Sequence, residues 1–219
     1  MATVSPVSPF DPASPDRPKR GELSIQQSGR IIGGMVAVLW AIEVIDTIVN
    51  HRLDRYGVRP RSVRGLRGIP LAPLLHANFR HLIGNTIPLA AMGWLVLIGG
   101  VQRLVRNTIV IAVISGLGMW LFGGSNTVHI GASGVVFGYL GYLLLRGVFS
   151  RKLGQIALGL LVLVLYGGLI WGLLPTPSGV SWQGHLFGFL GGVLVARIEA
   201  QPSTGDDGPT SGVIPTTAV

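Results

Sequence analysis

The segment GASGV, residues 131–135, places Ser133 between two glycines at the start of a long apolar stretch. A serine there contributes little to packing that alanine would not. Two other segments, HANFRHLIGN (residues 76–85) and GHLFGFLGG (residues 184–192), also place histidine or asparagine near the start of an apolar stretch. Together the three segments predict hydrophobic helices that carry polar side chains near their N-terminal ends.

The composition is typical of a polytopic membrane protein. Of the 219 residues, 48% are hydrophobic and only 12% are charged, about half the charge of a soluble domain. The absence of cysteine excludes disulfides, thiolate nucleophiles and cysteine-ligated zinc. The net charge of +8 could suit nucleic acid, but the arginines lie between apolar segments, where lipid phosphates are nearest. We therefore expect membrane lipids as partners and no nucleic acid.

Six apolar stretches come close to the roughly 20 helical residues that cross a bilayer core. They cover residues 31–50, 79–98, 108–122, 131–145, 153–174 and 182–200. This pattern predicts an all-α membrane protein with a six-transmembrane-helix bundle over residues 30–200. The tails, residues 1–29 and 201–219, lack apolar periodicity and are expected to be disordered.

The loop between the first two stretches is basic. Its arginines recur at every third position from 61 to 67, which predicts an amphipathic helix at the membrane surface with Leu66, Ile69 and Leu71 in lipid. The positive-inside rule places both termini in the cytoplasm, although this basic loop opposes that orientation. We expect a multi-pass protein of a bacterial cell membrane.

Helix direction brings the polar segments together. Successive spanning helices alternate in direction, so the second, fourth and sixth run parallel. Asn85 with its neighbouring histidines, Ser133 and His185 all lie in the N-terminal halves of those helices. They are therefore expected on one side of the membrane, at similar depths.

A serine and a histidine at one depth suggest nucleophilic catalysis. A serine hydroxyl attacks only when a base takes its proton, and histidine is the usual base near neutral pH. Ser133 and His185 can form that pair. The acid nearest to His185 in the following sequence is Glu199, at the far end of the same helix. A dyad is therefore expected rather than a triad.

The same segments contain donors for an oxyanion. The backbone N–H of Ser133 lies at a helix N-terminus, where unpaired N–H groups and the helix dipole favour negative charge. His81 and Asn85 are four residues apart, on one helix face, and can add two side-chain donors. His76 is expected at the entrance of this helix.

Other interpretations of these residues exist. His76, His81 and His185 could bind a metal, but no HExxH motif or carboxylate partner supports this, and no metal or cofactor is expected. Glu43 and Asp46 could serve ion transport, although no inverted repeat is visible. The preferred interpretation is that these two carboxylates bond the arginines or backbone of the first loop.

Taken together, these segments resemble the rhomboid family of intramembrane serine proteases over residues 31–200. The resemblance depends on three ordered motifs: H-x4-H-x3-N (His76, His81, Asn85), G-x-S-G (Gly131, Ser133) and H-x-x-G (His185, Gly188).

The resemblance implies Ser133 as nucleophile, His185 as general base, and an oxyanion hole of His81, Asn85 and the Ser133 amide. It also implies single-pass transmembrane proteins as substrates, cut near the outer leaflet after a small residue. A substrate must enter sideways from lipid, so the helix over residues 153–174 is expected to be a movable wall, with the loop 175–179 as its hinge.

The chain departs from the family pattern at a few positions. Phe137 stands where the family often has tyrosine, and Gly184 stands where alanine is common; the first loop also lacks the family's usual Trp-Arg pair. Inactive relatives have lost the serine or the histidine, whereas this chain keeps Ser133 and His185. The alternative function is a non-catalytic membrane chaperone or quality-control protein on the same fold.

Overall fold

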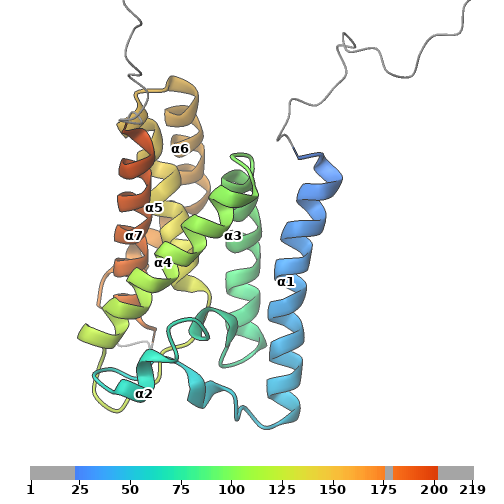
Figure 1. The fold of residues 1–219 in the computed structure, drawn as a ribbon, viewed down its shortest axis with the longest axis vertical. Helices are drawn as coiled ribbons and strands as arrows, with labels where there is room; N and C mark the ends of the chain where they lie inside the picture. The colour runs from blue at the N-terminus through green and yellow to red at the C-terminus, as the bar shows by residue number, and fades with distance from the viewer. Residues whose placement is uncertain (1–22, 176–179, 202–219) are drawn as a thin grey trace, which may run out of the picture.

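A computed structural model describes residues 23–175 and 180–201. The regular elements in this part of the chain are all helical, as predicted. They are α1 (Ile25–Ile48), η1 (Asp54–Tyr56), α2 (Val63–Leu66), η2 (Ala72–Leu74), α3 (Phe79–Leu97), α4 (Val101–Phe122), α5 (Ser133–Ser150), α6 (Leu153–Tyr166), η3 (Gly167–Leu173) and α7 (Trp182–Ala200), where η denotes a 3-10 helix. Helices α1, α4 and α6 run in one direction, and α3, α5 and α7 run in the other (Figure 1).

Two helices begin earlier than the hydropathy pattern predicts. Helix α1 begins at Ile25, six residues before the predicted start, because Ser24 and Gln27 form a capping box there. Residues 25–29, expected in the tail, therefore belong to this helix, whereas residues 1–22 and 202–219 of the predicted tails lie outside the described residues. Helix α4 begins at Val101, seven residues early, because the arginines of its first two turns pair with Glu199.

Helix α5 lies at the centre of the bundle, in contact with α3, α4, α6 and α7. Its Tyr139, Leu140, Tyr142 and Leu143 are fully buried. The predicted small-residue stripe lets α7 approach α5 backbone to backbone. A Cβ added to Gly188, for example, would collide with the carbonyl oxygen of a glycine in α5.

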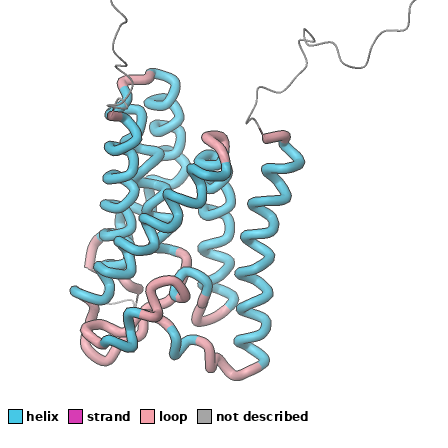
Figure 2. The backbone as a smooth tube through the Cα atoms, viewed as in Figure 1, coloured by secondary structure: helices cyan, strands magenta, loops and turns pink. Residues whose placement is uncertain are grey.

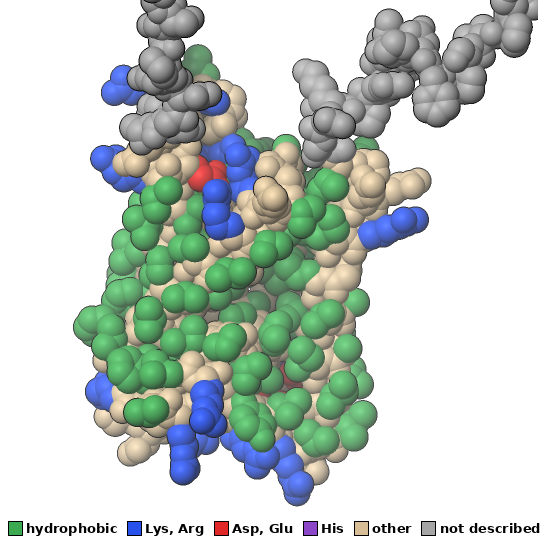
Figure 3. Space-filling view, in the orientation of Figure 1, with side chains coloured by type: hydrophobic (Ala, Val, Ile, Leu, Met, Phe, Trp, Pro, Cys, Tyr) green, Lys and Arg blue, Asp and Glu red, His purple; other side chains and the backbone are tan. Residues whose placement is uncertain are grey.

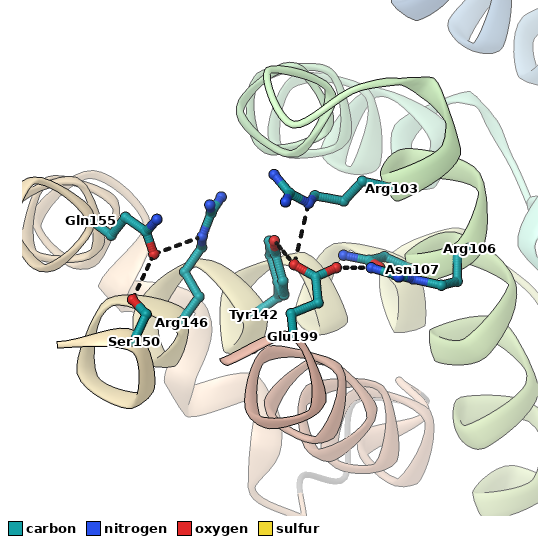
Figure 4. A network of polar contacts seen from close by, with 8 residues as sticks. All are labelled: Arg103, Arg106, Asn107, Tyr142, Arg146, Ser150, Gln155 and Glu199. Carbon is teal, nitrogen blue, oxygen red and sulfur yellow. Dashed lines mark hydrogen bonds and ion pairs between the residues drawn. The ribbon is translucent and has the colours of Figure 1, made fainter. Parts of the chain in front are cut away.

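Polar contacts connect four helices at the end where α4 and α6 begin. Glu199 of α7 pairs with Arg103 and Arg106 of α4 and accepts a hydrogen bond from the Tyr142 hydroxyl of α5 (Figure 4). Nearby, Arg146 of α5 donates to a side-chain oxygen in α6. Glu199 therefore has its partners at the C-terminal end of α7, far from His185 at the start of that helix.

The first loop, residues 49–78, crosses the opposite end of the bundle, where α3, α5 and α7 begin (Figure 2). The predicted amphipathic helix is wrong, because only the single turn α2 forms between residues 61 and 71. Ile69 packs in a small cluster around Val58, Ala72 and Met119 instead of entering lipid. Arg61 donates to two carbonyl oxygens at the end of α4. An arginine on a helix lying at the membrane surface would not reach these acceptors.

The two acids of α1 have different surroundings. Asp46 Oδ1 accepts a hydrogen bond from the backbone N–H of Leu53 at 2.7 Å, so its expected bond to the first loop is confirmed. For Glu43 the same expectation is wrong, since neither carboxylate oxygen has a hydrogen-bond partner among the described residues.

Four of the predicted spans have the length and composition to cross a membrane, within the described residues: Ile25–Ile48, Val101–Phe122, Ser133–Ser150 and Leu153–Leu173. Helices α3 and α7 have 19 residues each, about 28 Å at 1.5 Å per residue, but they include polar motif residues, namely His81 and Asn85 in α3 and His185 in α7. Hydrophobic side chains cover the middle of the visible face, and lysines and arginines gather at both ends (Figure 3).

Candidate active site

Ser133 and His185 meet at the end of the bundle crossed by the first loop. The distance between Ser133 Oγ and His185 Nε2 is 2.9 Å. Ser133 is the first residue of α5, and His185 lies in the first turn of α7, which is capped by Ser181. Because α5 and α7 run parallel and begin at the same end of the bundle, two side chains that are 52 residues apart in the sequence lie within hydrogen-bond distance.

The other ring nitrogen of His185 contacts the backbone of η3. Its Nδ1 lies 2.9 Å from the carbonyl oxygen of Gly172. A carbonyl can only accept, so Nδ1 must carry the proton in this bond. In the neutral ring, Nε2 is then free to accept the hydroxyl proton of Ser133. The Gly172 carbonyl has the orienting position that a carboxylate occupies in a triad.

The imidazole ring is held between an aromatic ring and η3. Phe137, one turn after Ser133, stacks on His185 with ring centroids 4.0 Å apart and planes 9° apart. A Cβ at Gly172 would lie 2.7 Å from Phe137 Cζ and 3.2 Å from His185 Nδ1. Only glycine therefore lets η3 approach this closely.

Polar groups for an oxyanion lie beside Ser133. Gly131 has φ +117°, and a Cβ there would lie 2.6 Å from His81 Cε1 and 3.7 Å from Asn85 Nδ2. Glycine is therefore required by both conformation and space. Asn85 Nδ2 is buried and has no hydrogen-bond partner among the described residues. The Ser133 N–H belongs to the first turn of α5, where intrahelical acceptors are absent.

His76 holds the backbone just before Ser133. Its Nε2 accepts the N–H of Ala132 at 3.3 Å, and its ring meets the edge of His81 at 5.1 Å between centroids. Burial, with a smaller contribution from His81, lowers the pKa of His76 to about 4. The ring therefore stays neutral, and remains an acceptor, down to acidic pH.

A cavity of about 800 Å³ opens beside the pair. It is bounded by the start of α3, the segment before α5, η3, and the start of α7. Its lining includes His81, Asn85, His129, Ser133, Gly172 and His185.

The structure thus brings together every residue that the three motifs singled out. Gly188 lies one turn beyond His185, at the contact between α7 and α5. Sequence reasoning did not find the Gly172 carbonyl, because a backbone acceptor leaves no side-chain signal. It also missed Ser115 of α4. The Ser115 hydroxyl donates to the carbonyl of Gly184 at 2.8 Å, and Gly184 directly precedes His185.

Comparison with known proteins gives consistent matches. A family model described as the rhomboid domain matches residues 65–202, which include all three motifs. An uncharacterized protein of Mycobacterium tuberculosis is 46% identical over 185 residues, 78% of this chain and 77% of that protein. An uncharacterized protein of Mycobacterium leprae is 40% identical over 185 residues, 78% of this chain and 73% of that protein.

A more distant relative has a functional name. The Bacillus subtilis protein named "Putative rhomboid protease YdcA" is 28% identical over 135 residues, 58% of this chain and 64% of that protein. The family model covers more than half of the chain, and four helices are long and apolar enough to cross a bilayer. This multi-pass membrane protein therefore belongs to the rhomboid family.

Proposed function

We propose that this chain is an intramembrane serine protease that cleaves transmembrane segments through an acyl-enzyme. The observation that supports this most directly is the continuous chain from Ser133 Oγ through His185 to the Gly172 carbonyl, with 2.9 Å at each contact. This arrangement contains a nucleophile, a base of the correct tautomer and a group that orients the base.

In the proposed acylation step, Ser133 Oγ attacks the scissile carbonyl carbon while its proton passes to His185 Nε2. The imidazolium that forms is stabilised by its Nδ1–H bond to Gly172. The oxyanion receives hydrogen bonds from the Ser133 amide, Asn85 Nδ2 and His81. His185 then protonates the leaving amine, and the acyl group stays on Ser133.

Deacylation repeats these roles with water as the nucleophile. His185 removes a proton from water, the water oxygen attacks the ester carbonyl, and the proton returns to Ser133 Oγ as the ester breaks. No step requires a cofactor or a metal.

The proposed substrates are single-pass transmembrane proteins cut after a small residue near the outer leaflet. In this proposal α3 and α7 complete a six-span bundle, and both termini face the cytoplasm of a bacterial cell. Basic side chains at both ends of the apolar band (Figure 3) favour lipid phosphates over nucleic acid as partners.

Covalent labelling tests the proposal. Purified protein in detergent micelles is treated with a fluorophosphonate probe, and labelling is compared between wild type, Ser133→Ala and Ser28→Ala. Ser28 lies in the first turn of α1, so its variant controls for the loss of a serine. We expect labelling in wild type and Ser28→Ala and none in Ser133→Ala.

Labelling that is absent from folded wild type, or unchanged in Ser133→Ala, contradicts the proposal. If wild type is not labelled but still binds transmembrane segments, the non-catalytic chaperone function would be favoured.

A further inference from the structure

Carboxylate oxygens without hydrogen-bond partners gather where α1 meets the first loop. Among the described residues, six buried side-chain atoms have no hydrogen-bond partner, and four of them are oxygens of Glu43, Asp46 and Asp54. Glu43 and Asp46 are each 1% exposed and lie three positions apart on one helix face. An unpaired charged carboxylate is costly to bury, and a positive charge nearby would offset that cost.

The neighbouring side chains do not supply enough of that charge. His51 Nδ1 lies 3.8 Å from Asp46 Oδ2 and 3.8 Å from Asp54 Oδ2, too far for hydrogen bonds. Arg52 and Arg55 follow this histidine in the sequence, but among the described residues neither forms an ion pair. Arg55 instead donates to a neighbouring tyrosine hydroxyl. A divalent cation would balance the remaining negative charge.

The spacing of the three side chains suits a metal. One ligand atom each from Asp46, His51 and Asp54 lies within 4.8 Å of the other two. Tetrahedral Zn²⁺ with bonds of about 2.0–2.2 Å holds its ligand atoms roughly 3.3–3.6 Å apart, so the 3.8 Å gaps need to close only slightly.

Asp46 is already oriented for such a role. Its Oδ1 accepts the Leu53 N–H at 2.7 Å, which leaves Oδ2 toward His51. The side chains of His51 and Asp54 are 40% and 25% exposed. An ion and a coordinating water can therefore enter from the aqueous side.

The donor atoms select among cations. Ca²⁺ and Mg²⁺ take oxygen ligands, whereas Zn²⁺ accepts imidazole nitrogen together with carboxylate oxygen. We propose that Asp46, His51 and Asp54 bind one Zn²⁺, with Glu43 adding negative charge from the buried side. The ion links the end of α1 to the first loop.

This link supports one wall of the active-site cavity. Four residues after Asp54, Val58 exchanges two backbone hydrogen bonds with His129, at 3.0 and 2.9 Å. His129 lines the cavity beside Ser133 and His185. The ion thus fixes the part of the first loop that pairs with the cavity wall.

Calorimetry on the full chain tests the site. Protein in detergent micelles is stripped with a chelator and titrated with ZnCl₂. We expect one ion per chain in wild type. His51→Ala and Asp54→Asn should weaken binding by at least about 100-fold, because loss of a mere supporting group already costs about 10–100-fold. His185→Ala should bind Zn²⁺ as wild type does, which separates this site from the catalytic pair.

A second measurement guards against misfolding of the variants. Zn²⁺ should raise the thermal midpoint of wild type and of His185→Ala but not of His51→Ala, whose partly exposed ring makes its removal tolerable. The proposal is overturned if wild type shows no saturable binding, if binding survives in His51→Ala, or if equimolar Ca²⁺ displaces the ion. These readouts do not depend on proteolysis.

Discussion

Replacing Gly172 by alanine tests whether the η3 backbone orients His185, the proposed general base. The new Cβ would lie 2.7 Å from Phe137 Cζ and 3.2 Å from His185 Nδ1. Carbon atoms in contact are about 3.5 Å apart or more, so Phe137 or η3 must retreat by about 0.8 Å. His185 is stacked on Phe137 at 4.0 Å and bonded to Gly172, so either adjustment disturbs a contact that holds its ring.

A shift of that size affects the chemistry. A retreat of η3 would stretch the 2.9 Å contact between Gly172 and His185 Nδ1 beyond hydrogen-bond range, and a shift of the imidazole with Phe137 would do the same to the 2.9 Å Ser133–His185 contact. A misplacement of about 1 Å costs about 100-fold in rate. We therefore expect Gly172→Ala to lower kcat by about 100-fold while KM changes little.

The assay is cleavage of a fluorogenic transmembrane substrate in proteoliposomes, with kcat and KM determined separately. Gly167→Ala is the matched control, because it lies in the same 3-10 helix and its Cβ would meet nothing closer than 3.4 Å. It adds the same methyl group at a distance from the ring. A Gly172→Ala enzyme whose kcat stays within about twofold of Gly167→Ala would refute the orienting role.

Three other predictions follow from the same geometry. Asn85→Ala should lower kcat by about tenfold to a thousandfold, the range for one oxyanion donor; a raised KM with unchanged kcat would argue against that role. The depressed pKa of His76, about 4 against an ordinary 6.5, means that stability is fully present above pH 6.5 and falls by about 3 kcal/mol as the pH drops toward 4, because only the unfolded chain takes up the proton. Thermal melts at pH 7 and pH 4.5 should show a smaller loss for His76→Asn than for wild type, and equal losses would contradict this assignment. A disulfide between cysteines introduced at the start of α3 and in η3, on two sides of the cavity, should block cleavage of a membrane-embedded substrate until it is reduced; full cross-linking with undiminished cleavage would show that substrate enters elsewhere.

The gate remains a prediction from sequence and cavity position. The hinge is expected at residues 175–179, of which 176–179 lie outside the described residues. The described part of this wall does change character along its length, from the α-helix Leu153–Tyr166 to the 3-10 helix Gly167–Leu173. The Gly172 carbonyl of this 3-10 helix contacts His185, so the element proposed as the gate also contacts the proposed base.

Local pattern was sufficient to predict most of the helices and to predict that the candidate site residues lie at one end of the bundle. Apolar stretches of about 20 residues mark spanning helices whatever their partners, and the alternating helix directions place Ser133 and His185 at one end. The early starts of α1 and α4 were missed because a capping box and a contact with Glu199 extend each helix into polar sequence. Hydropathy does not register either effect.

What the sequence by itself determined is the set of helices, the membrane class and the polar residues at three parallel helix starts, because these follow from composition and from spacing along one chain. Only the tertiary structure decided which groups touch. The Gly172 carbonyl contacts His185, Arg61 caps α4 instead of facing lipid, and Asp46 of α1 meets His51 and Asp54. Each of these contacts joins separate elements through backbone atoms or loop geometry, and none of the three can be predicted from the order of side chains.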